Sequence, residues 1–437
     1  MALKRLGTGK NPLILTLDLL KALFGRTPPG AVRFQLWDGT GWPDPGPGGG
    51  EVRATLVLKH PGALRSMFLP GTELGLAEAY LYDDFDIEGE AEAVFQYAET
   101  LLEAAAGLGT KLRLGGELRR LPAGGRTHRS RRGPASLRGR AHTAERDRQA
   151  VRYHYDVSND FYQLWLDPGM VYSCAYFRSP TDDLETAQVN KLDHLCRKLR
   201  LRPGQRLLDI GCGWGGLAIH AARHYGADVT GITLSQPQAD LANRRIAAAG
   251  LAERARAAVR DYREVEADPP YDALVSVGMF EHVGLAMLPR YFKKAFELLR
   301  PGGVFLNHGI SDGTRKRVGS DFTDRYVFPD GQVVPVSATL HVAEAADFEV
   351  RDGESLREHY ALTLRHWVRN LERRHAEALR YVDEPTYRVW RLFMSGAAYG
   401  FDHGGLNVHQ TLLVKPDEEG RAHLPLTRED WYRPKGG

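Results

Sequence analysis

The chain is poor in cysteine and has no long apolar run. Its three cysteines, Cys174, Cys196 and Cys212, form no Cys-x-x-Cys pair, which argues against a disulfide framework or a cysteine-based zinc site and fits a reducing compartment. We expect no metal site. No apolar stretch approaches the roughly 20 residues that a membrane-spanning helix needs. These absences favour a cytoplasmic protein that would meet lipid only from the membrane surface.

The chain as a whole also lacks a strong excess of one charge, since its formal net charge is +3. One segment does have such an excess. Residues 107–148 contain twelve Lys or Arg and three acids, with frequent Gly and Pro and no amphipathic period. We interpret this segment as a basic flexible linker. It could be a plain spacer or an electrostatic tether to anionic phospholipid headgroups. Because no aromatic residues are interleaved with the charges, nucleic acid is not an expected partner.

The linker separates two regions with different patterns. Residues 1–106 are expected to form a small α+β domain, because short alternating segments lie between helical ones. Its first helix is predicted over residues 12–25, with one apolar face formed by Leu13, Leu17, Leu20 and Phe24. Residues 149–437 alternate strands and helices, which is typical of a parallel, doubly wound α/β sheet. The expected fold is a Rossmann-like catalytic domain preceded by the smaller domain.

The first strand of the second region runs into a glycine-rich turn, Leu207-Leu-Asp-Ile-Gly-Cys-Gly-Trp-Gly-Gly216. Glycines there let a ligand approach the backbone, and their spacing fits either a dinucleotide or S-adenosylmethionine. A nicotinamide site expects an acid at the tip of the second strand, where this chain has Thr233-Leu-Ser-Gln236. Asp209 suits a contact to a methionine group, and Leu299-Arg-Pro-Gly-Gly303 is similar to a turn of class I methyltransferases. The motif therefore favours an S-adenosylmethionine-dependent methyltransferase over a nicotinamide-dependent oxidoreductase.

Further motifs in a fixed order carry a closer resemblance. They are Leu74-Gly-Leu-Ala-Glu-Ala-Tyr80, Tyr153-His-Tyr-Asp-Val-Ser-Asn-Asp-Phe-Tyr162, Asp167-Pro-Gly-Met-Val-Tyr-Ser-Cys-Ala-Tyr-Phe177, Gly231-Ile-Thr-Leu-Ser-Gln236, Asp261-Tyr-Arg263, Phe280-Glu-His-Val-Gly284 and Tyr326-Val-Phe-Pro-Asp-Gly331. Together with the glycine-rich turn, they resemble the cyclopropane-fatty-acyl-phospholipid synthase family, which includes the class I methyltransferases similar to mycolic acid cyclopropane synthases. The resemblance covers most of the chain except the linker.

The resemblance assigns residues to two sites. The pocket for S-adenosylmethionine would be lined by Tyr172, Ser173, Asp209, Gly211, Gly213, Thr233, Leu234, Gln238, Asp261 and Tyr262. Family members also hold a bicarbonate ion that acts as the general base. Its ligands, the implied catalytic residues, would be Cys174, Glu281, His308, Ile310 and Tyr360. Backbone atoms are one option for the contacts of Cys174 and Ile310.

The implied reaction accounts for these residue types. An alkene attacks the sulfonium methyl group without prior deprotonation and becomes a carbocation. This cation needs shelter from water and a small anionic base that removes a proton from the new methyl group. The expected substrate is an unsaturated phospholipid at the inner face of the membrane, whose cis double bond becomes a cyclopropane. Apolar segments over 322–336 and 359–401 are expected to form the acyl-chain channel.

One position departs from the family pattern. Many members carry a cysteine where this chain has Ala397, so no thiol nucleophile is available there. Relatives of this fold quench the same cation by a hydride shift, giving a methylene branch that a separate reductase can saturate. The sequence favours cyclopropane but leaves the methylene product open. It also leaves open a homodimer and a non-catalytic lipid-binding role.

Overall fold

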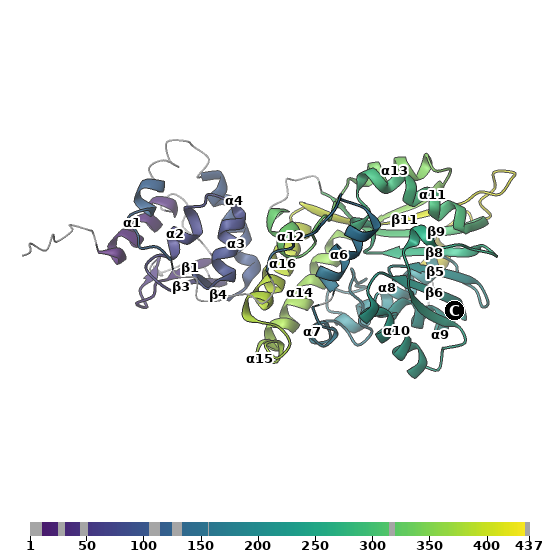
Figure 1. Ribbon diagram of the computed structural model, residues 1–437, viewed down its shortest axis with the longest axis horizontal. Helices are drawn as coiled ribbons and strands as arrows, with labels where there is room; N and C mark the ends of the chain where they lie inside the picture. Colours follow the sequence, from purple (N-terminus) through teal and green to yellow (C-terminus); the bar gives the residue numbers. More distant parts are fainter. Residues whose placement is uncertain are drawn as a thin grey trace, which may run out of the picture. The chain divides into compact units, whose positions relative to one another are not determined.

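The computed structural model describes residues 11–24, 31–43, 51–104, 114–124, 133–155, 157–313 and 320–432 (Figure 1). They divide into two compact units, each described here by itself. The N-terminal unit contains the described residues within Met1–Gly133, with Val318–Thr323 and Val382–Tyr399. The second unit contains those within Pro134–Arg317, Asp324–Tyr381 and Gly400–Gly437.

The N-terminal unit is built on a four-stranded sheet of order β2-β1-β3-β4. The strands are β1 (Val32–Gln35), β2 (Gly41–Trp42), β3 (Ala54–Leu58) and β4 (Phe85–Gly89), and only the β1–β3 pair is parallel. The helices are α1 (Pro12–Phe24), α2 (Ala63–Phe68), α3 (Glu73–Leu81) and α4 (Ala91–Ala104). The expected α+β character of this region is confirmed.

Helix α1 lies where it was predicted, and its buried face extends beyond the predicted one. The buried residues are Leu15, Thr16, Leu19, Leu20 and Phe24. Of the predicted apolar face, Leu20 and Phe24 are buried, while Leu13 and Leu17 are half-buried. Leucines occur all around this helix, and the pattern alone therefore does not define its face. The buried side is set by packing, since the Phe24 ring stacks on Tyr97 of α4 at 4.7 Å between centroids.

Most of helix α16 (Glu384–Asp402) belongs to the N-terminal unit, although it lies far along the chain. The buried guanidinium of Arg388 donates to the carbonyl oxygen of Tyr80 at 2.7 Å. Arg391 donates to the carbonyl oxygens of Ile87 at 2.9 Å and Gly89 at 3.1 Å. The sequence had placed this segment in the catalytic domain as part of an acyl-chain channel. The contacts instead tie it to strand β4, and Ala397 lies on this helix.

The second unit contains a seven-stranded sheet of order β10-β11-β9-β8-β5-β6-β7 (Figure 1). Its strands are β5 (Arg206–Ile210), β6 (Asp228–Thr233), β7 (Ala255–Val259), β8 (Tyr271–Val277), β9 (Leu299–Asp312), β10 (Glu349–Ser355) and β11 (Leu406–Val414). Strand β11 is antiparallel to both β9 and β10. The expected parallel sheet is thus confirmed from β5 to β9, while the antiparallel β11 was not foreseen.

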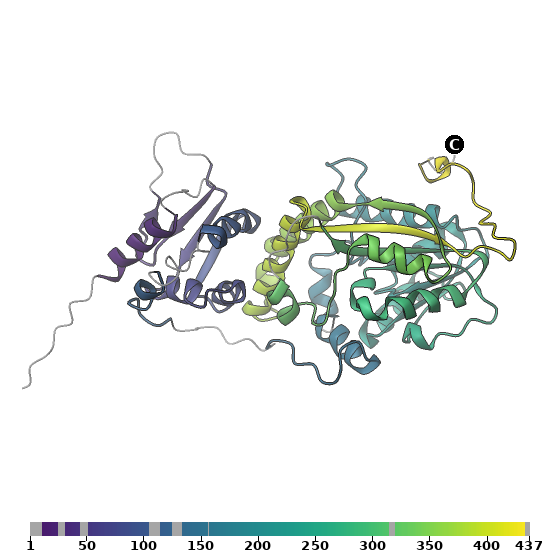
Figure 2. The same cartoon turned by 90° about the horizontal axis from the view of Figure 1, so that it is seen from above.

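Helices cover both faces of this sheet (Figure 2). One core joins α8 (Leu184–Lys198), α9 (Gly216–Tyr225) and α10 (Gln236–Ala248) to side chains such as Leu207. The other joins α11 (Leu288–Leu298) and α13 (Val336–Glu344) to side chains such as Leu208. Adjacent residues of a strand point to opposite faces, so a buried parallel strand needs apolar residues at both. The result is a three-layer α/β unit, as predicted.

The predicted linker is partly structured where it approaches this unit. Helix α6 (Ala144–Tyr155) begins within the range 107–148, and the Arg146 guanidinium forms an ion pair with Asp330 at 2.5 Å. The described residues of this stretch after Pro134 are grouped with the second unit. The remaining helices of this unit are α7 (Asn159–Gln163), α14 (Arg357–Arg373), α15 (His375–Ala378) and α17 (Glu429–Tyr432). Helix α12 (Ser320–Tyr326) is divided between the two units, with its residues from Asp324 on in this one. Over the described ranges, we find no helix with the length and apolarity needed to cross a bilayer.

Candidate active site

The glycine-rich turn lies between the end of β5 and the start of α9. Gly211 and Gly213 have φ angles of 88° and 51°, in the region that residues with a side chain rarely adopt. A Cβ atom at Gly211 would lie 2.9 Å from the side chain of Met279, whereas one at Gly213 would meet nothing within 4 Å. The backbone at Gly213 therefore borders open space that a ligand can approach.

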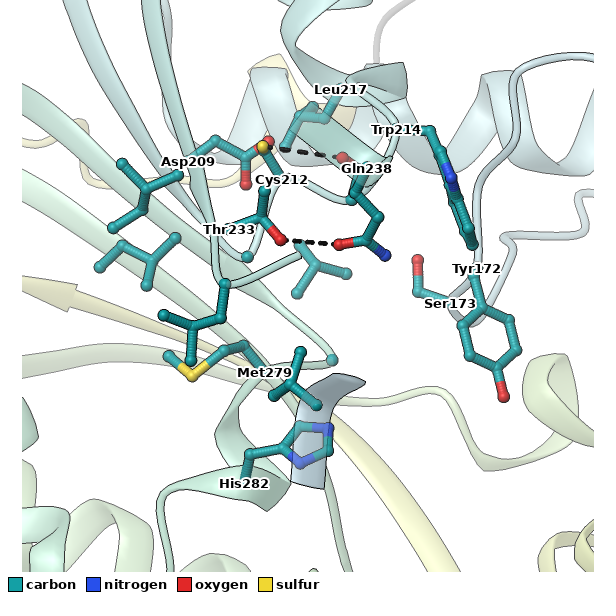
Figure 3. Close-up of a pocket in the computed structure, with 18 of the residues that line it drawn as sticks. Tyr172, Ser173, Asp209, Cys212, Trp214, Leu217, Thr233, Gln238, Met279 and His282 are labelled. Atoms are coloured by element: carbon teal, nitrogen blue, oxygen red, sulfur yellow. Dashed lines mark hydrogen bonds between the residues drawn. The ribbon is translucent and has the colours of Figure 1, made fainter. Parts of the chain in front are cut away.

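A pocket opens over this turn, at the carboxyl ends of β5, β6 and β8 (Figure 3). It is lined by all ten residues that the sequence assigned to the cofactor, namely Tyr172, Ser173, Asp209, Gly211, Gly213, Thr233, Leu234, Gln238, Asp261 and Tyr262. The carboxyl edge of a parallel sheet is where such folds place their ligands. The structure thus brings this predicted set together around one cavity.

The end of β6 is fixed by a short hydrogen-bonded turn. The Thr233 hydroxyl donates to the side-chain oxygen of Gln238 at 2.7 Å, and both residues are buried. The Ser235 side chain caps the N-terminus of α10 by accepting from the backbone N–H of Gln238. The side-chain amide nitrogen of Gln238 is directed toward the cavity (Figure 3). A polar group is therefore held in one orientation at the pocket wall.

Asp261 is held in the ionised form. Burial alone would raise its pKa, but the hydrogen bonds and charge of Arg263 outweigh burial and lower the pKa. The Arg263 side chain donates to both carboxylate oxygens, at 2.8 and 2.6 Å. Arg263 also pairs with Asp147 of α6 at 3.0 Å. The pocket wall at this point is a fixed carboxylate, suited to accept hydrogen bonds from a ligand.

None of the five residues predicted to hold bicarbonate lines this pocket, but several lie together nearby. One carboxylate oxygen of Glu281 accepts from the backbone N–H of Ile310 at 2.5 Å. The Cys174 thiol lies 3.7 Å from the carbonyl oxygen of Leu356, which also accepts from the backbone N–H of Tyr360. Burial, reinforced by the neighbouring Cys174, Glu281 and Tyr155, raises the pKa of the Tyr360 hydroxyl well above its ordinary value.

Glu281 and His308 both carry a polar atom without a partner. Among the described residues, no group hydrogen-bonds the Oε2 atom of Glu281 or the Nε2 atom of His308, and both atoms are buried. Such atoms cost free energy unless something fills the site. Burial raises the pKa of Glu281 to about 7. Burial and then the charge of Lys191 lower the pKa of His308 well below its ordinary value, so its imidazole is neutral.

Sequence reasoning missed several residues of the pocket wall. They include Tyr155, Lys191, Trp214, Met279 and His282. The most informative is Lys191, because it is 1% exposed. Lys191 follows Leu184 and Gln188 and precedes Leu195 on the buried face of α8. The sequence signal for this residue is a lysine at helical spacing among residues expected to be buried.

This sheet order, the glycine turn and the pocket at its carboxyl edge define an S-adenosylmethionine-dependent methyltransferase of the class I fold. The chain resembles the solved cyclopropane synthase of Mycobacterium tuberculosis at 33% identity and a TM-score of 0.59, over 61% of this chain and 97% of that one. A mycolic acid cyclopropane synthase solved with SAH and CTAB is similar at 33% identity and a TM-score of 0.58, with the same shares covered.

The model of the mycolic acid cyclopropane synthetase family matches residues 142–411, and the chain belongs to that family. It is 44% identical to a probable fatty acid methyltransferase of Pseudomonas putida, over 92% of this chain and 96% of that one. It is 36% identical to a probable fatty acid methyltransferase of Mycobacterium tuberculosis, over 98% of this chain and 100% of the other. A tuberculostearic acid methyltransferase of the same organism is 37% identical, over 63% of this chain and 66% of that one.

Proposed function

We propose that the enzyme transfers the methyl group of S-adenosylmethionine to the cis double bond of an unsaturated phospholipid acyl chain and closes a cyclopropane ring, with bicarbonate as the base. The observation that carries this proposal is the pair of unpartnered buried atoms, Glu281 Oε2 and His308 Nε2. A methyl transfer that ends with the loss of a carbon-bound proton needs a base in a dry site. A binding protein would have no use for such a site.

The side chains near Glu281 fit a small anion such as bicarbonate, which donates a hydrogen bond from its hydroxyl group and accepts hydrogen bonds at its oxygens. The Nδ1 atom of the neutral His308 ring lies 3.2 Å from the side-chain amide nitrogen of Gln410 and can accept a hydrogen bond from it. The proton of the ring is then on Nε2, which can donate to an anion. The Tyr360 hydroxyl stays protonated and can donate as well. Glu281 can accept from the anion or release a proton at neutral pH. Bicarbonate, when bound, would supply the base.

The chain itself provides shelter for a carbocation. Tyr155 and Tyr172 line the cofactor pocket, and their ring centroids lie 6.1 Å apart. Both belong to an aromatic cluster that also contains Tyr162, Trp165 and Trp214. Aromatic faces stabilise a nearby cation without acting as nucleophiles. Such walls would keep water from the cation, and water would otherwise add to it and give an alcohol.

The alternative product is a methylene branch formed after a hydride shift, which a separate reductase could saturate. The specific observation in its favour is that the relatives that match 92% and 98% of this chain are named probable fatty acid methyltransferases. Those named cyclopropane mycolic acid synthases match 61% of this chain. Ala397 also departs from the cyclopropane pattern.

We further propose that the substrate is reached at the inner membrane face and that the basic segment 107–148 tethers the enzyme to anionic headgroups. Part of that segment lies outside the described residues. The remaining support is its charge, and a plain spacer is the alternative.

The test is to incubate the enzyme with trideuteromethyl-labelled S-adenosylmethionine and phospholipid vesicles whose acyl chains carry a vinylic deuterium. Mass spectrometry should show the added carbon in the lipid. Ring closure leaves the vinylic deuterium in place, whereas a hydride shift moves it to the neighbouring carbon. A migrated label with an exocyclic methylene signal by NMR would replace the cyclopropane product with the methylene one. If the phospholipid carries no label after the incubation, phospholipid is not the acceptor.

A further inference from the structure

A row of three polar side chains crosses the sheet of the second unit. In the antiparallel pairs of β11, Gln410 lies directly opposite His308 of β9 on one side and Glu354 of β10 on the other. Residues directly opposite on neighbouring strands place their side chains on the same face of a sheet. Gln410 is 0% exposed and His308 is 2% exposed, so water does not compete for the contact between them.

The carboxylate at the far end of this row has partners of its own. Glu354 pairs with Lys198 at 2.5 Å and with His194 at 2.8 Å. Burial alone would raise the pKa of Glu354, but the hydrogen bonds and charges of these two partners lower it to about 2. Among the described residues, Gln410 forms no side-chain hydrogen bond to Glu354. Its amide nitrogen instead lies 3.2 Å from Nδ1 of His308, so the amide is committed to the imidazole.

The contact with Gln410 decides where the imidazole carries its proton. His308 is neutral because burial, and then the charge of Lys191, lower its pKa well below the ordinary value. In a neutral imidazole one nitrogen donates and the other accepts. An amide N–H group can only donate, so its partner Nδ1 carries no proton and the ring proton is on Nε2. This is the buried atom of His308 that has no partner among the described residues.

The other edge of β9 shows why the position of this proton matters. Ile310, two residues after His308 on β9, donates its backbone N–H to the Glu281 carboxylate at 2.5 Å. His308 thus lies between Gln410 on β11 and the segment that carries Glu281. With the proton on Nε2, the ring can donate to an anion bound near Glu281. With the proton on Nδ1, the ring would present a lone pair there and repel the anion.

We propose that Gln410 is a positioning residue that keeps the proton of His308 on Nε2, so that this nitrogen can donate to the bicarbonate base. Gln410 acts through His308 alone, and the hydrogen bond made by one ring nitrogen sets the protonation of the other. The inference rests on the base site of the proposed function. It does not involve the cofactor, since neither residue belongs to the lining of the S-adenosylmethionine pocket.

Two substitutions of Gln410 and one matched control separate this role from a structural one. Gln410→Glu replaces the donor by an acceptor of nearly the same shape, and Gln410→Met removes the donor and keeps the length. The control is Thr411→Val on the same strand. Thr411 is 1% exposed and its hydroxyl donates to the carbonyl oxygen of Asn307 on β9 at 3.2 Å. Thr411→Val therefore also removes one hydrogen bond between β11 and β9, but on the opposite face.

The first measurement is ¹⁵N NMR of the histidine rings in the ligand-free enzyme, with His308→Gln to assign the signals among the 16 histidines. In the wild type and in Thr411→Val, Nε2 should be protonated and Nδ1 should not. In Gln410→Glu, measured in alkaline buffer where the new carboxyl group is ionised, the proton should be on Nδ1. A wild-type ring protonated on Nδ1 would overturn the proposal, as would a Gln410→Glu ring protonated like that of the wild type.

The second measurement is turnover in buffer freed of CO₂, followed as bicarbonate is added back. Gln410→Glu should need at least about tenfold more bicarbonate for half of its maximal turnover, because a hydrogen bond to a charged group contributes roughly this much to affinity. Gln410→Met should fall between Gln410→Glu and the wild type. The affinity for S-adenosylmethionine should change less than about twofold in both. Thr411→Val should keep the wild-type dependence on bicarbonate. Equal changes in Thr411→Val and Gln410→Met would make Gln410 structural.

Failure of the proposed base gives a different result from failure of the inference. If wild-type turnover does not depend on bicarbonate, the base is wrong, and the proposal that Gln410 serves it falls with it, whatever the tautomer. If turnover depends on bicarbonate but the His308 proton is on Nδ1, the base stands and the role of Gln410 falls. Thermal unfolding of each variant, compared with Thr411→Val, shows whether a lower turnover comes from a loss of folded protein.

Discussion

Two groups of buried charged side chains lie in the methyltransferase unit, and they differ in how their charges are partnered. Around the end of α8, Lys198 and His194 both contact Glu354, at 2.5 and 2.8 Å. The exposed guanidinium of Arg428 pairs with the buried carboxylate of Asp352 at 2.8 Å. At the carboxyl edge of the sheet, Lys191, Asp209 and Glu281 are just as buried but form no ion pair with a described residue.

The comparison separates charges that stabilise the fold from charges that lower the stability of the ligand-free protein. A charge that is paired inside the protein stabilises the fold only if both partners stay, and removing one leaves the other buried alone. A charge without an internal partner lowers the stability of the ligand-free protein and is compensated only when a ligand binds. We therefore assign the first group to folding and the second to ligand binding and catalysis.

The largest expected effect is on turnover. Glu281→Gln should fold and bind S-adenosylmethionine as the wild type does but lose roughly 100-fold or more of its turnover. The bicarbonate base would lose a partner that orients it, and general acid–base catalysis contributes about 10² to 10⁴. Incorporation of labelled methyl into vesicles measures this, with Glu354→Gln as the control for a paired glutamate. Turnover within about threefold of the wild type would make Glu281 structural.

The pH profile sharpens the same prediction. If the ionised form of Glu281 is the active one, wild-type turnover should rise as pH passes through about 7, the pKa that burial gives it. The residual activity of Glu281→Gln should lack this step. The raised pKa also means that the folded state loses stability as pH rises from the ordinary carboxyl range to about 7. Glu281→Gln should avoid that loss.

The second effect is on cofactor binding. Gly213→Val should weaken S-adenosylmethionine binding at least about 100-fold, roughly 3 kcal/mol, because the side chain would occupy the space that the backbone leaves for the ligand. Gly204→Val is the control, since Gly204 also has a positive φ, of 79°, and a Cβ there would meet nothing within 4 Å. It lies outside the pocket lining. Equal affinities of the two variants for S-adenosylmethionine would show that the glycine turn is not part of the cofactor site.

Much of the second unit could be predicted from sequence because its signals are local. The alternation of strands and helices over residues 149–437 was predicted, and strands β5 to β9 form the expected parallel sheet. The glycine turn was recognised for the same reason, since a positive φ demands glycine wherever the chain folds. The grouping of the ten pocket residues followed from the family resemblance and from the rule that ligands bind at the carboxyl edge.

Other features depend on contacts that the sequence does not display. Strand β10 reads Glu-Val-Arg-Asp-Gly-Glu-Ser, with no apolar alternation, and it forms because β11 pairs with it. Helix α6 has many charged residues, and Arg146 and Asp147 find partners far along the chain in Asp330 and Arg263. Helix α16 could not be assigned to the N-terminal unit, because Arg388 bonds to residues about 300 positions earlier.

The most direct test of the difference between the two groups is thermal unfolding without ligand of Lys191→Met and Lys198→Met. Lys198→Met breaks a buried ion pair, which costs about 3 kcal/mol and lowers the melting temperature of this unit by roughly 5–10 °C. Lys191→Met removes a buried charge that forms no ion pair with a described residue, so its melting temperature should fall much less than that of Lys198→Met. A similar fall in both variants would contradict the account, because Lys191 would then be holding the fold rather than waiting for a ligand.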